Sequence, residues 1–247
     1  MLSGVMILMS ALLGVLLAPS PTRIFILTGQ SNMLGLASVA SMPAQYRVVP
    51  PNVVVWDDTA WVPLKPFGNS DSTFGPEIAF GIAVAQSRPH EHIGLIKLAR
   101  GGSPISAWAG GDSSLYSALL RRVQLALRSS PNARIEGVLW VQGERDARSQ
   151  ELALSYAEKL DSLVVAFRRD LRVGDLSFFC AEVNPPYPFA TAVRAAQVSL
   201  PSRLPRTFVV TSEGLSKNAD GVHYDAAGQI GLGLRFAAAY EGSLKTR

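Results

Sequence analysis

The sequence predicts an α/β fold in which a mostly parallel sheet is covered by helices. After residue 20, short apolar or β-branched runs alternate with longer amphipathic runs, which is typical of strands joined by crossover helices. Hydrophobic residues make up 48% of the 247 residues, enough for a sizeable buried core. No break in composition, internal repeat or low-complexity segment divides the chain, so we expect one folded domain.

The first twenty residues are expected to stand apart from this domain. Residues 2–18, LSGVMILMSALLGVLLA, carry no charge and are slightly longer than a typical signal core but short for a membrane span. This segment predicts an exported protein, secreted or periplasmic, with residues 1–20 as a signal peptide or retained membrane anchor. No Lys or Arg precedes it, and Pro19 and Pro21 follow it, so a misplaced start codon is a third alternative. Residues 21–247 form the expected domain.

The expected strands and helices follow from these runs in chain order. Six apolar runs are strand candidates: RIFILTG (23–29), NVVVWD (52–57), HIGLIKLA (92–99), IEGVLWVQG (135–143), LSFFCAEV (176–183) and RTFVVTS (206–212). Amphipathic runs predict helices over 76–87, 115–129, 150–169, 190–200 and 225–240. Pro76 and Glu77 suit a first helical turn, and Asp225 is a plausible N-cap.

Charge and cysteine content exclude several classes of partner. The net charge is +4, but the basic residues are scattered, without the basic, aromatic-interleaved stripe of a nucleic-acid-binding protein. The single cysteine, Cys180, lies in an apolar run and forms no intrachain disulfide. His90 and His92 lie in the polar segment SRPHEH with no further ligands nearby, and there is no H-E-x-x-H motif. We therefore expect no nucleic-acid partner and no metal.

Four polar or glycine-rich clusters follow strand candidates. They are GQSN (29–32), RGGSPISAW (100–108), QGERD (142–146) and NADGVHYD (218–225). In open α/β sheets, ligands bind beyond the carboxyl ends of the strands, so these clusters are expected to meet at one edge. Connecting loops are polar in any case, so this pattern alone does not establish a site.

Three residues in these clusters suit nucleophilic catalysis. Ser31 lies where the first strand must turn, and a serine hydroxyl needs a base before it attacks a carbonyl carbon. Asp220 and His223 are close enough on a tight turn for the carboxylate to orient the imidazole toward a nucleophile. Ser31 alone would also suit a helix N-cap, and DGVH alone would suit a simple turn.

An acyl-transfer site also needs N–H donors for the developing oxyanion. Gly101 or Gly102 allows a backbone N–H to approach without side-chain interference, although a Gly-Gly pair also suits a plain turn. Ser31 offers its own N–H, and Gln142 has a side-chain amide at the end of the fourth strand candidate. The candidate oxyanion hole therefore comprises Ser31, Gly102 and Gln142.

The segments GQSNM, GGSPISAW, WVQGERDA and DGVHYDAAG, taken together, resemble the SGNH-hydrolase superfamily over nearly all of residues 23–240. More narrowly they resemble the sialate O-acetylesterase and acetyl xylan esterase branch, carbohydrate esterase family six. This resemblance implies a three-layer, flavodoxin-like α/β/α sandwich and a serine esterase that removes acetyl groups from a carbohydrate without a cofactor. It also implies that Ser31 is the nucleophile, His223 the base and Asp220 the residue that orients it.

The chain departs from the family pattern at two positions. Where the family usually has HQGESD, this chain has VQGERD, so His is replaced by Val141 and Ser by Arg145, which changes the charge near the pocket. Glu144 is retained and is an alternative acid partner for His223. Sequence proximity favours Asp220 for that role.

Substrate contacts are expected from Gln30 and Asn32 beside Ser31, and from Trp108, which could stack on a sugar face with Trp56 and Trp61 or simply pack in the core. An acetylated carbohydrate is the expected partner, and the sequence does not indicate an oligomeric state.

Two alternative functions keep the fold. One is an inactive carbohydrate-binding protein, and the other is an esterase acting on a non-sugar ester. Phosphate binding is disfavoured, because no Lys-Ser or Lys-Thr follows the glycines and no G-x-G-x-x-G opens the first helix.

Overall fold

The computed structural model describes residues 20–65, 72–109 and 114–245. The expected signal or anchor segment, apart from its last residue, lies outside the described residues. Within these ranges, no helix is both long enough and apolar enough to cross a membrane.

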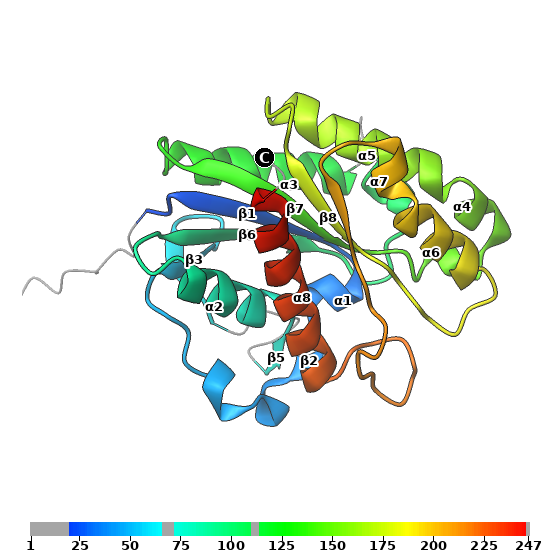
Figure 1. The fold of residues 1–247 in the computed structure, drawn as a ribbon, viewed down its shortest axis with the longest axis horizontal. Helices are drawn as coiled ribbons and strands as arrows, with labels where there is room; N and C mark the ends of the chain where they lie inside the picture. Colours follow the sequence, from blue (N-terminus) through cyan, green and yellow to red (C-terminus); the bar gives the residue numbers. More distant parts are fainter. Residues whose placement is uncertain (1–19, 66–71, 110–113, 246–247) are drawn as a thin grey trace, which may run out of the picture.

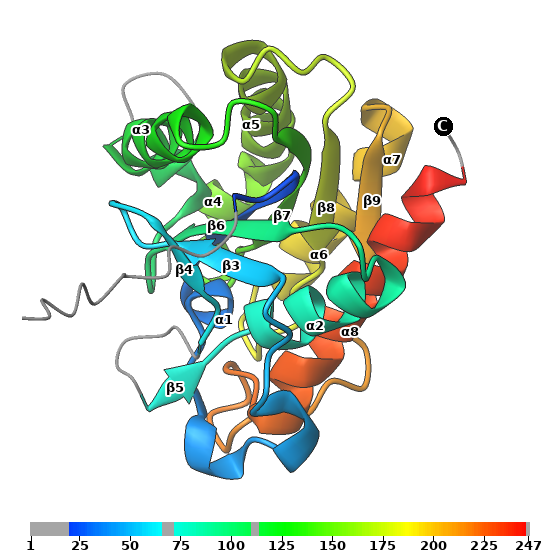
Figure 2. The same ribbon diagram turned by 90° about the vertical axis from the view of Figure 1, so that its left-hand side faces the viewer.

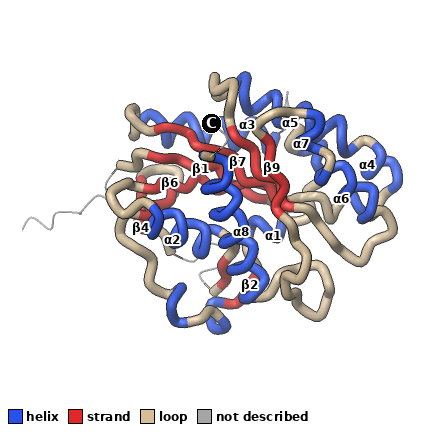
Figure 3. Tube along the Cα trace, in the orientation of Figure 1, coloured by secondary structure: helices blue, strands red, loops and turns tan. Residues whose placement is uncertain are grey.

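A seven-stranded sheet forms the centre of the domain, in the order β4-β3-β6-β1-β7-β8-β9. All neighbouring strands are parallel except β3 and β4, which pair antiparallel at one edge. The strands are β1 (Arg23–Gly29), β3 (Val53–Trp56), β4 (Trp61–Pro63), β6 (Ile93–Ala99), β7 (Arg134–Val141), β8 (Ser177–Ala181) and β9 (Thr207–Val210). A separate two-stranded ladder joins β2 (Ala37–Ser38) to β5 (Thr73–Phe74). Figure 3 shows the strands as one layer between helices.

Helices cover both faces of this sheet, which confirms the predicted three-layer α/β/α fold (Figures 1 and 2). One face is covered by α2 (Glu77–Ser87) and α8 (Ala226–Leu244), and the other by α3 (Ser114–Arg128), α5 (Tyr156–Asp170) and α6 (Ala190–Val198). The shorter helices are α1 (Ser31–Leu34), α4 (Gln150–Leu154) and α7 (Leu200–Arg203), with 3-10 turns at Val39–Ser41, Ala44–Tyr46, Ile105–Ala107 and Asp146–Arg148.

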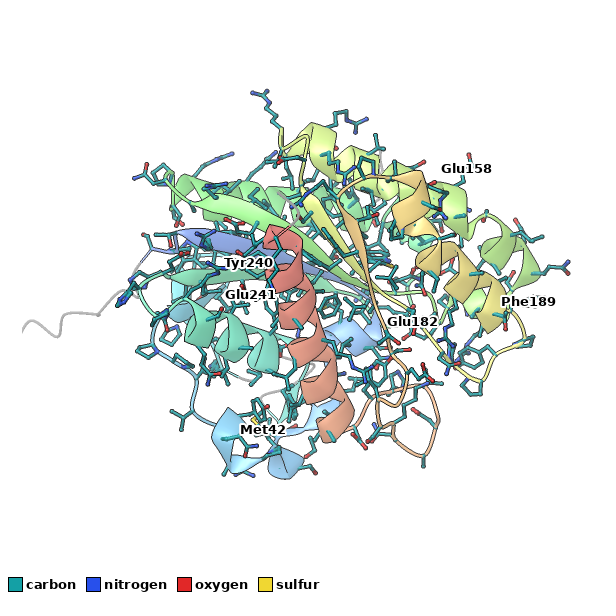
Figure 4. The ribbon with its side chains drawn as sticks, in the orientation of Figure 1. Met42, Glu158, Glu182, Phe189, Tyr240 and Glu241 are labelled. Carbon is teal, nitrogen blue, oxygen red and sulfur yellow. The ribbon has the colours of Figure 1, made fainter. Side chains whose placement is uncertain are left out.

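Aromatic side chains fill the core on each face of the sheet. Phe25 makes edge-to-face contacts with Phe80 of α2 and Tyr240 of α8, at centroid distances of 4.9 and 4.8 Å; Figure 4 labels Tyr240. On the other face, Trp108 packs edge-to-face on Trp140, with centroids 5.9 Å apart. Such pairs add to the stabilisation from burial. The first two join α2 and α8 to β1, and the third joins the loop after β6 to β7.

Two expected helices are interrupted. The run 150–169 forms α4 and α5, which are separated at Ser155, whose hydroxyl donates to the carbonyls of Glu151 and Leu152. The run 190–200 ends as α6 at Val198 and is followed by α7. The expected cap of the last helix is confirmed, because the Asp225 side chain accepts a hydrogen bond from the Gly228 N–H at 2.9 Å.

The three central strands end at the same level. Gly29, the last residue of β1, is in register with Ala99 of β6 and Val141 of β7. Gly29 has a φ of +141°, and a Cβ there would lie 2.0 Å from the Val141 carbonyl oxygen, so only glycine fits this close approach. The segments that follow these strands therefore begin side by side at the carboxyl edge.

Candidate active site

The short helix α1 presents Ser31 at this edge. The N–H of Gln30 donates to the Val141 carbonyl at 2.8 Å, which fixes the turn from β1 into α1. At the other end of α1, Lys97 Nζ donates to the Leu34 carbonyl at 2.9 Å. Burial lowers the pKa of Lys97, and its ion pair with Glu77, at 2.7 Å, opposes that shift. Both ends of the helix that bears Ser31 are thus anchored to the sheet.

The turn before α8 brings Asp220 and His223 to Ser31. Asp220 Oδ1 accepts hydrogen bonds from the N–H groups of Val222 and His223, at 2.8 and 2.9 Å, as an Asx turn does. Asp220 Oδ2 lies 2.6 Å from His223 Nδ1, and His223 Nε2 lies 3.0 Å from Ser31 Oγ. Because the ionised carboxylate only accepts, Nδ1 carries the proton and Nε2 is left to accept from the serine hydroxyl.

The electrostatics of Asp220 favour this arrangement. Burial raises the pKa of Asp220, but the hydrogen bonds from the two backbone N–H groups and from the His223 ring outweigh it and hold the pKa at about 2. The carboxylate therefore stays charged beside the imidazole at neutral pH.

Glu144, the alternative acid partner, does not pair with His223. Its Oε1 accepts from Asn32 Nδ2 at 2.6 Å, and its Oε2 is buried without a hydrogen-bond partner in the described part of the chain. Burial raises the pKa of Glu144, while the bond from Asn32 lowers it. The geometry thus pairs His223 with Asp220.

Two of the three residues expected to donate to the oxyanion, Ser31 and Gly102, line the cavity. Gly102 has a φ of +67°, lines the cavity and would place a Cβ in open space. Across the described ranges, the N–H groups of Ser31 and Gly102 have no hydrogen-bond acceptor. Each is therefore available to a substrate oxygen.

Gln142 does not take the position expected for the third donor. Its side chain is fully buried, and Nε2 donates to the Ser103 carbonyl at 2.9 Å and to Asp146 Oδ2 at 2.6 Å. Since an amide nitrogen has two hydrogens, both are already used. The expectation that Gln142 donates to the oxyanion is wrong, and the residue instead holds the Ser103 loop beneath the site.

The expected substrate contacts also differ. Trp108 is fully buried and its Nε1 donates to Ser103 Oγ at 2.9 Å, so stacking on a sugar is wrong for this residue. Trp56 and Trp61 are buried as well. Asn32 is 1% exposed and points into the protein, so it does not contact substrate.

Gln30 does line the cavity. Its Oε1 accepts long hydrogen bonds of 3.3 Å from the N–H groups of Gly143 and Arg145, and it also lies 3.3 Å from Gln142 Nε2, whose two hydrogens point to nearer acceptors. The Gln30 Nε2 atom is therefore the part of this side chain that is available to a substrate.

A cavity of about 300 Å³ opens above these groups. Its lining includes Ser31, Gly102 and His223 together with Arg145, Arg148 and Tyr187. The Arg148 guanidinium lies over the Tyr187 ring, 4.3 Å from its centroid, and also hydrogen-bonds its hydroxyl. Sequence reasoning missed Arg148 and Tyr187, because nothing in the chain order links the 3-10 turn after β7 to the proline-rich loop after β8.

Within the described ranges, no group of three or more His, Cys, Asp or Glu side chains is placed to hold a metal ion.

The mostly parallel sheet of this α/β/α fold, with a serine, a histidine and an aspartate aligned at its carboxyl edge, defines an SGNH-type hydrolase. The family model described as carbohydrate esterase, sialic acid-specific acetylesterase, matches residues 21–242. The chain belongs to this family and is an esterase.

Similar proteins agree with this placement. A probable carbohydrate esterase of Arabidopsis thaliana is 30% identical over 241 residues, covering 89% of this chain and 90% of that protein. The crystal structure of an Arabidopsis thaliana protein superimposes with a TM-score of 0.81 at 28% identity, covering 90% of this chain and 98% of the other. The structure of NanS, 19% identical, has the same fold, with a TM-score of 0.75 over 93% of this chain and all of the other. A probable 9-O-acetyl-N-acetylneuraminic acid deacetylase of Escherichia coli strain K12 is 33% identical over 83 residues, 30% of this chain and 25% of that protein.

Proposed function

We propose that this esterase removes O-acetyl groups from a carbohydrate through an acyl-enzyme formed on Ser31. The observation that carries the proposal is the chain of hydrogen bonds from Asp220 Oδ2 through His223 to Ser31 Oγ, with lengths of 2.6 and 3.0 Å. Such a chain makes a serine hydroxyl nucleophilic at neutral pH.

The reaction proceeds in two steps. Ser31 Oγ attacks the acetyl carbonyl carbon while its proton passes to His223 Nε2, and the N–H groups of Ser31 and Gly102 stabilise the oxyanion. The carbon–oxygen bond to the sugar then breaks, and His223 donates the proton to the departing sugar oxygen. Water, deprotonated by His223, then attacks the acyl carbon, and the bond from that carbon to Ser31 Oγ breaks. His223 donates its proton to Ser31 Oγ, and the acetyl group leaves as acetic acid, which ionises to acetate.

Within this class, we propose that the substrate is an acidic sugar, which carries a carboxylate as well as its acetyl ester. Arg145 and Arg148 line the same cavity as Ser31, and arginine binds planar carboxylates well. The acidic residue of the lining, Glu144, is buried and accepts a hydrogen bond from Asn32. The Escherichia coli relative is named for an acidic sugar of this kind, which supports the acidic type over neutral acetyl xylan.

Hydrolysis of 4-nitrophenyl acetate by the wild-type protein and by Ser31→Ala tests the mechanism. We expect Ser31→Ala to lower the rate by about a thousandfold or more. Equal background rates in two folded proteins would reject the esterase proposal and favour an inactive carbohydrate-binding protein.

The substrate class is tested with an O-acetylated sialic acid, an acetylated xylo-oligosaccharide and 4-nitrophenyl acetate. Because one charged hydrogen bond contributes about 1.5–3 kcal/mol, we expect Arg148→Ala to raise KM for the acidic sugar by about tenfold or more. The other two substrates should be little affected. Equal effects on acidic and neutral sugars would reject carboxylate recognition, and a preference for non-sugar esters would move the substrate outside carbohydrates.

A further inference from the structure

The side chain of Asn32 links the nucleophile helix to the backbone around His223. Its Nδ2 donates to the Val222 carbonyl at 3.1 Å, and its Oδ1 accepts from the Tyr224 N–H at 3.0 Å. These two groups belong to the peptide units on either side of His223. The Asn32 side-chain amide thus hydrogen-bonds both peptide units that set the direction of the His223 imidazole.

The position of this amide in the chain makes the link short. Asn32 directly follows Ser31 in α1, so the atoms that fix His223 are tied to the residue next to the nucleophile. The Asn32 carbonyl also accepts from Gln229 Nε2 of α8 at 3.1 Å, which fastens the same helix to the element after the histidine turn. A shift of the histidine turn relative to Ser31 would break the two bonds from the Asn32 side chain to Val222 and Tyr224.

Glu144 accepts the second hydrogen of the same amide nitrogen. Its Oε1 lies 2.6 Å from Asn32 Nδ2, and its side chain is 4% exposed. A carboxylate accepts and does not donate, so it fixes the nitrogen end of the amide toward itself. This contact explains the place of Glu144 in the site without any bond to His223.

We propose that Asn32 is a positioning residue that sets the His223 imidazole against Ser31, and that Glu144 acts through Asn32 rather than as an acid partner of His223. The effect on turnover rests on the proposed esterase function, whereas the placement of His223 does not. A displacement of about 1 Å between reacting groups can cost about a hundredfold in rate. Loss of the Asn32 bonds should therefore act mainly on kcat.

The test compares full-length Asn32→Asp, Glu144→Gln and the double variant. Asn32→Asp keeps the side-chain shape but loses the donor and faces the Glu144 carboxylate. We expect kcat for 4-nitrophenyl acetate to fall about a hundredfold, with KM within about threefold. Glu144→Gln still accepts from Asn32 and should lose less than about tenfold. In the double variant the Gln amide can donate to Asp, so kcat should recover at least about tenfold over Asn32→Asp alone.

A second readout does not depend on hydrolysis. The low-field proton NMR signal of His223 Nδ1, assigned by its loss in His223→Ala, should broaden or disappear in Asn32→Asp and return in the double variant. Asn52→Asp is the matched control, because Asn52 Nδ2 also donates to a backbone carbonyl, that of Glu91 at 2.8 Å, far from the site. It should change neither the signal nor kcat. Should Asn32→Asp not fold, Asn32→Ser removes the amide without adding charge and gives the same comparison.

Two results would overturn the inference. One is an unchanged His223 signal in folded Asn32→Asp or Asn32→Ser, which would show that the bonds do not place the imidazole. The other is a loss in Glu144→Gln as large as in Asp220→Asn, which would make Glu144 a direct partner of His223. Failure of the esterase proposal is recognised separately, by equal rates in wild type and Ser31→Ala.

Discussion

Replacing Asp220 by Asn tests the interaction between the Asp220 carboxylate and the His223 imidazole. The carboxylate accepts three hydrogen bonds, two from the backbone N–H groups of Val222 and His223 through Oδ1 and one from His223 Nδ1 through Oδ2. In Asp220→Asn, the amide oxygen can keep the two backbone bonds, so the turn should persist. The amide nitrogen then faces Nδ1 and donates to it.

The consequence is a change of tautomer. With Nδ1 accepting, the imidazole proton moves to Nε2, 3.0 Å from Ser31 Oγ, and can no longer receive the serine proton. Removing this orientation costs about 10⁴ in kcat in serine hydrolases of the same geometry. At about 1.36 kcal/mol per factor of ten, that is about 5 kcal/mol of lost transition-state stabilisation.

The assay is steady-state hydrolysis of 4-nitrophenyl acetate by wild type, Asp220→Asn and Glu144→Gln, with circular dichroism to confirm folding. We expect Asp220→Asn to lose about 10⁴ in kcat and far more than Glu144→Gln. A loss under about tenfold in Asp220→Asn, with a greater loss in Glu144→Gln, would refute the reasoning and make Glu144 the acid partner.

Three further predictions concern stability and the oxyanion hole, and one concerns pH. Trp108→Phe loses the hydrogen bond to Ser103 and should lower the free energy of unfolding, measured in urea, by about 1–3 kcal/mol. KM for the sugar should not change, and a raised KM would show that Trp108 contacts the substrate. Lys97→Met leaves the buried Glu77 carboxylate unpaired and should cost about 3–5 kcal/mol in the same assay; a loss under about 1 kcal/mol would contradict it. Gly102→Ala meets no neighbour but strains the backbone at a φ of +67°, so kcat should fall more than KM changes, and an unchanged kcat would remove Gly102 from the oxyanion hole. Because the Asp220 pKa falls from 3.8 to about 2 on folding, its stabilisation is present above about pH 4 and is lost as pH falls through about 2; the stability difference between wild type and Asp220→Asn in urea should be constant from pH 7 to 5 and shrink by pH 3.

Much of the fold follows from patterns that act over short distances. The central strands are apolar runs that end in glycine or polar residues, and each one is found in the sheet. The edge strand β4 was missed, because three residues ending in Pro63 give no periodic signal, and its pairing depends on the contact of Trp61 with Trp56. The break at Ser155 was missed because the amphipathic pattern continues through it, while the serine hydroxyl competes for the carbonyls of the preceding turn.

The residues of the site also fall into two groups, those that local patterns predict and those that they do not. Asp220 and His223 lie within one turn, and Ser31 follows a strand at the expected edge, so their meeting follows from local geometry and sheet topology. The direction of a side chain at a strand end depends instead on partners that are not evident in advance. Gln142 turns away from the cavity because Asp146 and the Ser103 carbonyl take both of its hydrogens.

The two departures from the family's HQGESD pattern have different consequences. Val141 is 1% exposed and packs in the core between the sheet and the layer of α2 and α8. An apolar side chain suits that environment, and only its backbone carbonyl serves the site, through the bond from Gln30. Arg145, by contrast, is exposed and lines the cavity, where a cation in place of a serine changes the field that a substrate meets. The first departure therefore alters packing and leaves the chemistry in place. The second bears on substrate choice, so Arg145→Ser should lower the preference for an acidic over a neutral acetylated sugar.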